Sequence, residues 1–542
     1  MPTPRFEPPE GLIGAFRTDE DARAVYSEAA GIGRVPPTAV AVPLNVKDVS
    51  MLVRWAREHG HAIVPRGSGS SMAGGAIGSG VVLDLSRLRG LHDADVDGRC
   101  IRADAGVLRG ELDRHAKACG MRFPVDPSSG EFCTIGGMAA TNAAGPHSLR
   151  HGSMRPWVLA LDCVFEDGST ATVRRGEPPP AQIPAVRRFM QNVHPALLDA
   201  DATASHAGVL KDSSGFALGA YAQTQELVDL LVGSEGTLAL FTAVEVALIP
   251  VSAASGSLLV SFVRLEQAVE AAIAAREAGA AACELLDRTF LTIAAKADRA
   301  LPVSPDADAA LLVEVESHNS SSAAAAIDQL RDLFRSLGSE DAVVASGQRH
   351  EAELWSFRHA ASPAIARMDP ALRSMQFIED AAVPPRALAA YVRGARVALE
   401  RAGTAGVIFG HAGDAHVHVN PLLDVNRRDW RDCVEQILLE VTDLVAKLGG
   451  TLTGEHGDGR LRTPLLDRVW SPSARERFAM IKRAFDPENI LNPGVKIPLA
   501  GQQAIDVVKY DPTLDPLPAA ARAALHTVER ERAYSRFRLD LL

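Results

Sequence analysis

Hydrophobic residues recur with helical and strand spacing along much of this chain. Apolar side chains fall three or four positions apart over residues 45–60, and Gly60 follows as a stop signal, so this segment is predicted to be an amphipathic helix. Its apolar positions are Val46, Val49, Leu52, Val53 and Ala56. Short aliphatic runs at 62–64, 81–85 and 244–250 predict strands. The pattern therefore indicates a chain of mixed helices and strands.

Polar and apolar residues alternate strictly near residue 418. Val417 and Val419 separate three polar residues, and an apolar run at 407–409 precedes them. A period of two predicts a strand whose polar residues all point to one side. These polar residues are His416, His418 and Asn420.

Three loops between predicted elements are rich in glycine and other small residues, at 65–75, 126–145 and 233–238. Glycine lets backbone N–H groups converge on an anion such as a pyrophosphate. The first loop lacks the Rossmann spacing, because Met72 stands where a third glycine is required. Alone, this loop could equally be a flexible turn. Three such loops together suggest an extended ligand that lies on backbone, as a dinucleotide would.

Candidate chemistry gathers in Gly410–Asn420 and in Gly454–Arg460. His411, His418 and Glu455 offer two imidazoles and one carboxylate, the set that a zinc site with an open position uses. Their order in the chain disfavours the non-haem iron triad. His456 is the candidate proton acceptor because an imidazole titrates near neutral pH. The alternative interpretation is a run of histidines that are solvated or satisfied within a core.

Composition narrows the function classes. At 542 residues the chain is expected to form two or three subdomains, and a net charge of -11 without a Lys/Arg stripe disfavours nucleic-acid binding. No signal-peptide pattern and no apolar run of transmembrane length is present, so we expect a cytoplasmic protein, with peripheral membrane attachment still compatible. The six cysteines are scattered and are expected to be reduced thiols.

This chain resembles the FAD-dependent 2-hydroxy-acid dehydrogenases in its three glycine-rich loops, its two histidine segments and Leu491-Asn-Pro-Gly494. That family includes D-lactate dehydrogenase, the glycolate oxidase flavoprotein subunit and D-2-hydroxyglutarate dehydrogenase. The resemblance spans roughly residues 38 to 497 and implies an α+β fold of the vanillyl-alcohol oxidase type. The implied parts are an N-terminal extension (1–37), a two-part FAD-binding domain of the PCMH type (38–250), an antiparallel-sheet substrate (cap) domain with the metal site (251–480), a return to the flavin (481–500) and a C-terminal tail (501–542) whose helix is expected to pack on the surface.

The resemblance also implies roles for individual residues. His411, His418 and Glu455 would hold a divalent metal, with zinc expected, and His456 would be the base. Arg358 would clamp the substrate carboxylate and Asn420 would contact the substrate. FAD would be held by Arg66, Gly67, Ser68, Gly69, Ser70, Ser71, Pro127, Ser128, Thr134, Gly136, Gly137, Asn142, Gly145, Glu235 and Asn492. The flavin is expected to be non-covalent because serines occupy the positions where covalent relatives carry histidine.

The implied activity is oxidation of a D-2-hydroxy acid to the 2-oxo acid by hydride transfer to FAD. D-lactate, D-2-hydroxyglutarate and glycolate remain candidate substrates, and the electron acceptor would be a quinone, an electron-transfer protein or an iron–sulfur partner. A homodimer is compatible with the sequence. The alternatives are a zinc hydrolase without flavin and a non-catalytic flavoprotein subunit of an electron-transfer complex.

At four places the sequence leaves the role of a residue or segment open. His416 replaces an asparagine of the relatives and could alter the metal geometry or face outward, and His151 replaces a tyrosine. Dicarboxylate-specific relatives carry a lysine near the strand before Pro384, where this chain shows Ile378-Glu-Asp380, and this disfavours a second carboxylate on the substrate. Lys211 lies in a segment that resembles one near the flavin.

Overall fold

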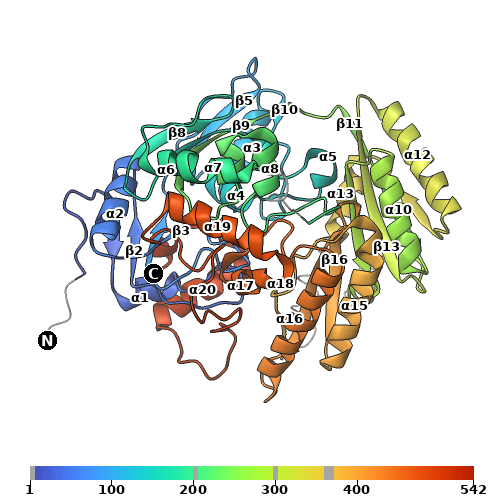
Figure 1. Cartoon of the computed structure of the whole chain (residues 1–542). Coiled ribbons are helices and arrows are strands. Elements are labelled where there is room, and N and C mark those ends of the chain that lie inside the picture. The colour runs from blue at the N-terminus through green and yellow to red at the C-terminus, as the bar shows by residue number, and fades with distance from the viewer. Residues whose placement is uncertain (1–5, 199–205, 297–302, 359–370) are drawn as a thin grey trace.

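A small mixed sheet opens the fold of this computed structural model, which describes residues 6–198, 206–296, 303–358 and 371–542. Its strand order is β1-β2-β4-β3, and β2, β4 and β3 run parallel. The strands are β1 (Ala15–Arg17), β2 (Ala39–Val42), β3 (Ile63–Arg66) and β4 (Val81–Asp84). Helix α2 (Val46–Glu58) begins after the side-chain cap Asn45 and packs on one face, as its apolar spacing predicts. The other face is covered by α1 (Glu20–Val25) and α20 (Ala519–Glu531) (Figure 1).

A second, antiparallel sheet has the order β5-β9-β7-β8. Its strands are β5 (Cys100–Asp104), β7 (Val158–Val164), β8 (Thr170–Arg174) and β9 (Leu240–Ala247), and a two-stranded ribbon joins β6 (Met121–Arg122) to β10 (Ile249–Pro250). Around it lie α3 (Arg109–Lys117), α4 (Ile135–Thr141), α5 (Ser148–His151), α6 (Pro184–Asn192), α7 (His194–Leu197), α8 (Leu218–Thr224) and α9 (Leu227–Leu231). Both sheets together form the cofactor half of the molecule.

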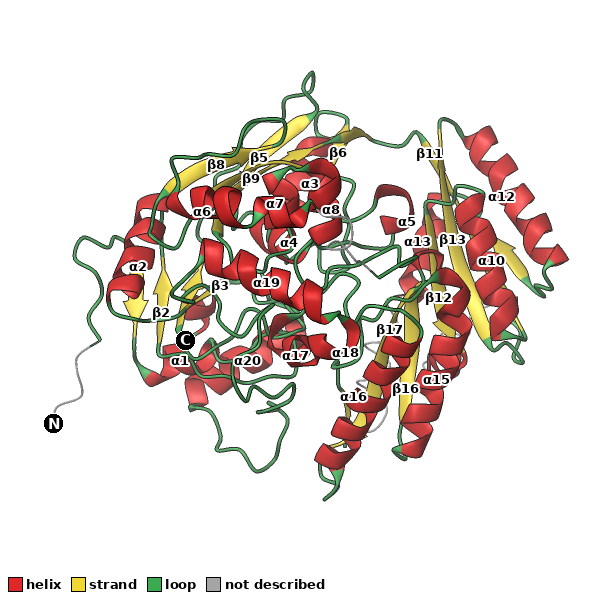
Figure 2. Ribbon diagram, in the orientation of Figure 1, coloured by secondary structure: helices red, strands yellow, loops and turns green. Residues whose placement is uncertain are grey.

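The second half is a seven-stranded antiparallel sheet of order β14-β11-β13-β12-β16-β17-β15. Its strands are β11 (Ala254–Phe262), β12 (Ala282–Asp287), β13 (Ala309–Ser317), β14 (Ala342–Val344), β15 (Leu372–Ser374), β16 (Ala405–His411) and β17 (His416–Asp424). One face is covered by α10 (Leu265–Glu277), α12 (Ser320–Ser336), α15 (Leu388–Arg401) and α16 (Trp430–Lys447) (Figure 2). The opposite face carries α11 (Arg288–Lys296) and α13 (Gln348–Arg358).

The chain returns to the cofactor half earlier than residue 481. Short helices α17 (Gly459–Arg462) and α18 (Leu466–Val469) lead into α19 (Pro472–Phe485), and Leu466, Trp470 and Phe478 belong to the core of the β5-β9-β7-β8 sheet. The buried apolar stripe of α19, which includes Phe478, Ile481 and Phe485, packs into the core of the β5-β9-β7-β8 sheet and accounts for the early return. The N-terminal extension is also part of the fold, since β1 and α1 lie within it.

The α+β architecture expected from the resemblance is confirmed: mixed elements in the cofactor half and an antiparallel sheet in the other. None of the helices within the described ranges has the length and apolar character needed to cross a membrane.

Candidate active site

The β16–β17 hairpin brings two of the predicted metal ligands together. His411 ends β16 opposite His416, and His418 of β17 stands opposite Phe409. The two rings His411 and His418 lie 5.4 Å apart between centroids. The alternation read from the sequence therefore does place these imidazoles on one side of a strand pair.

Each of these imidazoles has its Nδ1 fixed by the protein. His411 Nδ1 lies 2.5 Å from Glu284 Oε1, and His418 Nδ1 lies 2.8 Å from the backbone carbonyl of Glu379. Because both partners are acceptors, both Nδ1 atoms act as donors and leave Nε2 as the ligand atom. The Nε2 atoms of His411 and His418 lie 3.3 and 3.5 Å from the same oxygen, Oε1 of Glu455. The three predicted ligands thus converge.

Buried charge around Glu455 suits a cation. Burial opposes its ionised form, yet Lys211 and His411 hold the pKa of Glu455 well below its ordinary value. Burial and the neighbouring His416 lower the pKa of His418 well below its usual range, which keeps that ring neutral and able to bind metal. The Lys211 ammonium lies 2.7 Å from Glu455 Oε2. Burial opposes the charged form of His411, but Glu284 and Glu455 raise its pKa, so a metal would have to displace a proton from this ring. Two imidazole nitrogens and a carboxylate oxygen are the donor set of a borderline divalent metal such as zinc.

His416 does not face outward. Its side chain is fully buried, its Nε2 lies 2.9 Å from Asp380 Oδ1, and its ring centroid is 4.9 Å from that of His418. The Asp380 carboxylate pairs with the imidazole, which explains why a histidine in place of the relatives' asparagine is tolerated inside the core. Asp380, His416, His418 and Glu455 bring ligand atoms within 4.8 Å of one another and form a possible metal site, which includes the predicted ligands His418 and Glu455 but not His411.

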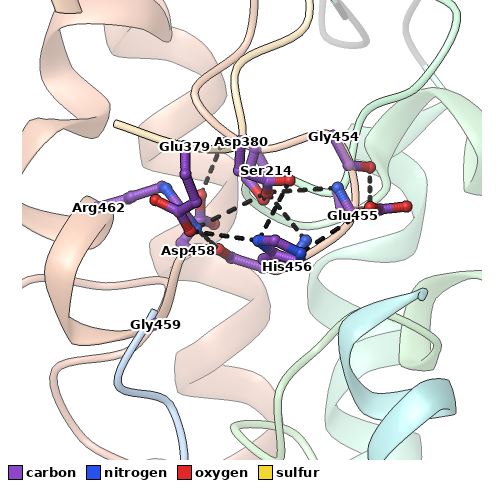
Figure 3. Close-up of polar contacts among 12 residues, drawn as sticks. Ser214, Glu379, Asp380, Gly454, Glu455, His456, Asp458, Gly459 and Arg462 are labelled. Atoms are coloured by element: carbon purple, nitrogen blue, oxygen red, sulfur yellow. Dashed lines mark hydrogen bonds and ion pairs between the residues drawn. The ribbon is translucent and has the colours of Figure 1, made fainter. Parts of the chain in front are cut away.

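His456 is held by two carboxylates (Figure 3). Its Nδ1 lies 3.2 Å from Glu379 Oε1, and its backbone N–H donates to Asp380 Oδ2 at 2.9 Å. Burial disfavours the charged ring, but Asp380 and Glu379 raise the pKa of His456 to about 9. Arg462 pairs with Glu379, and although burial opposes ionisation, Arg462 and His456 lower the pKa of Glu379 to about 2. The network stabilises an imidazolium at this position.

Arg358 and Asn420 reach the same cavity as His456. Arg358 ends α13; its Nε lies 2.5 Å from Glu284 Oε2, and its guanidinium stacks over Phe409 at 4.6 Å. It is therefore a buried, oriented cation and not a surface salt-bridge arginine. Asn420 is buried, and its Oδ1 has no hydrogen-bond partner among the described residues. An unpaired buried acceptor is suited to a ligand donor.

This cavity has a volume of about 1110 Å³ and continues from His456 to the glycine-rich loops. Small residues line it, and Ser71 Oγ is buried without a partner in the described part of the chain. A ligand lying on backbone, as expected for FAD, fits such a wall. The predicted cofactor residues that line it are Arg66, Gly67, Ser68, Gly69, Ser70, Ser71, Pro127, Ser128, Thr134, Gly136, Gly137 and Glu235.

Three predicted cofactor residues lie behind the wall. Asn142 ends α4 and accepts a hydrogen bond from the Arg155 amide, and a Cβ at Gly145 would lie 2.3 Å from the Asp126 carbonyl. Asn492 donates to the carbonyls of Gly75 and Glu235. Their side chains or backbone hold the loops and do not line the cavity.

Several residues near the site escaped the sequence interpretation. Glu284 orients His411, Glu379 orients His456 and Asp380 orients His416. Tyr510 and Tyr534 of the tail line the cavity. A lone carboxylate within the apolar run 280–286 was the available signal for Glu284. No local pattern marks the tyrosines.

Family comparisons agree with this geometry. Residues 37–174 match the FAD binding domain model, and residues 252–495 match the model of FAD linked oxidases, C-terminal domain. The chain is 31% identical to a D-lactate dehydrogenase of Archaeoglobus fulgidus, with 89% of this chain and 95% of the relative covered. It is 29% identical to a glycolate oxidase subunit of Bacillus subtilis, with 88% and 93% covered.

Solved structures share the fold. A 4-ethylphenol oxidase from Gulosibacter chungangensis superposes with a TM-score of 0.64 at 15% identity, with 90% of this chain and 95% of that chain covered. p-Cresol methylhydroxylase superposes with a TM-score of 0.62 at 16% identity, with 90% and 94% covered. With both domain models matched in order and a 31% identical relative covered over nearly its whole length, the chain belongs to the FAD-linked oxidase family.

Proposed function

We propose that this protein oxidises a D-2-hydroxy acid to the 2-oxo acid, with non-covalent FAD as hydride acceptor and a divalent metal, zinc expected, at His411, His418 and Glu455. One observation carries the proposal: a single cavity joins the glycine-rich loops to His456, Arg358 and two of the candidate metal ligands, His418 and Glu455. The named activities of the D-lactate dehydrogenase and glycolate oxidase relatives support the same substrate class.

Different residues would bind the substrate and take up its proton. Arg358, oriented by Glu284, binds the substrate carboxylate through the donors that its planar fork still offers, and Asn420 Oδ1 accepts from the substrate. His456 holds Nδ1 toward Glu379, so Nε2 of the neutral ring takes the hydroxyl proton, and the raised pKa of about 9 makes this neutral form the main one only at alkaline pH. Asp380 and Glu379 stabilise the imidazolium that this transfer creates. When bound, the metal polarises the hydroxyl oxygen and the flavin accepts the C2 hydrogen as hydride.

The substrate side chain is proposed to be small. The segment Ile378-Glu-Asp380 lacks the lysine that dicarboxylate-specific relatives carry in this region, which favours a lactate-like acid over hydroxyglutarate. Reduced flavin would pass its electrons to a quinone, an electron-transfer protein or an iron–sulfur partner.

The test is an anaerobic titration of the purified protein with D- and L-2-hydroxy acids, followed by the visible flavin absorbance. Bleaching by one D-acid, absent with its L-enantiomer and lost after a chelator, is the expected result. Bleaching that survives complete metal removal would overturn the metal's role, and a flavin that stays oxidised with every acid would overturn the substrate class. A protein that cannot be reconstituted with FAD would overturn the proposal as a whole.

A further inference from the structure

The C-terminal tail, residues 501–542, lies beyond the last residue matched by the family models and folds back on the cofactor half. Its segment at 507–509 pairs with residues 32–34 through Arg34 N–H to the Val507 carbonyl at 3.0 Å and Lys509 N–H to the Ile32 carbonyl at 2.8 Å. Helix α20 then packs Ala521 and Ala524 against the β1-β2-β4-β3 sheet. The tail is thus docked by both backbone and apolar contacts, as Figure 1 shows beside α1.

The docked tail forms one wall of the cofactor cavity. The tail residues that line it are Tyr510, His526, Glu529, Arg530, Arg532 and Tyr534. Tyr534 packs on Phe132 with ring centroids 5.3 Å apart, and the Arg532 guanidinium lies 5.2 Å from the same Phe132 ring. Phe132 belongs to the second glycine-rich loop, so the tail and this loop meet at the cavity wall.

The tail also holds the first glycine-rich loop. Buried Arg538 donates from Nη2 to the Ser68 carbonyl at 3.1 Å. Two further carbonyls of this loop accept from backbone N–H groups: that of Gly69 from Ala30 at 3.0 Å, and that of Ser71 from Gly31 at 3.2 Å. Residues 30 and 31 directly precede the segment that pairs with the tail.

These three contacts fix the direction of the loop amides. In a trans peptide the C=O and N–H groups point in opposite directions. Holding the Ser68, Gly69 and Ser71 carbonyls therefore turns the N–H groups that share their peptide planes, those of Gly69, Ser70 and Met72, to the opposite side of the loop. Within the described chain, these three amides donate to no protein acceptor. Successive free amides on one side of a loop form an anion-binding concavity.

We infer that residues 501–542 complete the dinucleotide site, with Arg538 as a positioning residue that, through the Ser68 carbonyl, sets the Gly69 amide beside those of Ser70 and Met72 for a diphosphate. The ligand class is a dinucleotide diphosphate such as that of FAD; free phosphate shares the chemistry but lacks contacts to the tail wall. The inference rests on the proposed flavin cofactor. Binding of FAD to the unsubstituted protein tests that cofactor separately.

The experiment compares binding of FAD, riboflavin and inorganic phosphate to flavin-free protein by calorimetry. Arg538→Ala should weaken FAD binding about tenfold to a hundredfold, as expected for loss of a charged hydrogen bond, and leave riboflavin affinity unchanged. Arg536→Ala, an exposed tail arginine, is the matched control. Equal FAD affinity in both variants, or equal losses for FAD and riboflavin, would overturn the inference. Phosphate binding as tight as that of FAD would assign the loop to free phosphate.

A second measurement needs no substitution. Hydrogen exchange of tail peptides 507–538 in the unsubstituted protein should slow when FAD binds, and should not change with riboflavin. Exchange that is indifferent to FAD would contradict a tail contribution even if Arg538→Ala failed to fold.

Discussion

Glu284 Oε1 lies 2.5 Å from His411 Nδ1, and the other oxygen of the same carboxylate lies 2.5 Å from Arg358 Nε. One buried side chain of β12 therefore orients both a candidate metal ligand and the candidate substrate arginine. Although burial opposes ionisation, His411 and Arg358 hold the pKa of Glu284 well below its ordinary range. The carboxylate is thus charged at every pH at which the protein would work.

Glu284→Gln should lower metal affinity about tenfold to a hundredfold, because a neutral amide orients His411 less firmly and makes it a weaker ligand. Competition with a coloured chelator measures this affinity. Glu340→Gln, at an exposed position, is the control and should match the unsubstituted protein. Unchanged metal affinity in Glu284→Gln would show that Glu284 acts on Arg358 alone.

Arg358→Lys should reduce kcat/KM for the 2-hydroxy acid about tenfold to a hundredfold, since lysine cannot reproduce the fork that reaches Glu284 and a carboxylate together. The flavin spectrum should not change. Arg349→Lys on the exposed side of the same helix is the matched control. Steady-state kinetics with both variants decide; equal kcat/KM values would remove Arg358 from the substrate site.

His456→Gln should slow flavin reduction by about a hundredfold to ten-thousandfold while metal and flavin content stay constant, because the proton acceptor is lost and the metal ligands are not. Stopped-flow measurement of the flavin band under anaerobic conditions gives the rate. His318→Gln, at an exposed position, controls for loss of an imidazole. A fast rate in His456→Gln would assign the base to another group.

His147 joins the two halves of the molecule, with Nδ1 2.6 Å from Asp126 and Nε2 3.0 Å from Glu314 of β13. Burial favours the neutral ring, but Asp126 and Glu314 raise the pKa of His147 well above its ordinary value. Its stabilising contribution is therefore complete below the unfolded pKa of about 6.5 and is lost as pH rises through the folded pKa.

His147→Gln should thus lower the free energy of unfolding most at acidic pH, and the difference from the unsubstituted protein should shrink as pH rises through that folded pKa. Urea denaturation over a pH series measures it. His92→Gln, at an exposed position, should show no such trend. A difference independent of pH would mean that His147 is not charged in the folded protein.

The sequence predicted those parts of the site that depend on residues close together in the chain. His418 stands in a strict alternation, and glycine marks the loops that line the cavity. Glu284 and Arg538 were missed for one physical reason: their partners lie 127 and 470 residues away. Nothing in the neighbouring sequence records such contacts, since they depend on which strands and segments become adjacent in space.

The placement of His416 shows the same limit. An alternating strand puts it on the polar side, but only the three-dimensional neighbourhood decides whether that side meets water or a carboxylate. Asp380, on a separate segment 36 residues earlier, makes the difference. The positions of Asn142 and Asn492 have a related cause, because hydrogen bonds to distant segments, with the Arg155 amide and the Glu235 carbonyl, hold both side chains behind the loops.

The early return of the chain has a consequence for biosynthesis. Helix α19 completes the core begun by β5 and β9, and Ala521 and Ala524 complete the one begun by β2–β4. The ribosome makes the whole seven-stranded sheet between these pieces, so its local hairpins can form before the first half has a finished interior. The cofactor half is therefore synthesised first, but its two cores are completed last. Its apolar faces stay exposed until chaperones cover them or until the final residues of the chain emerge.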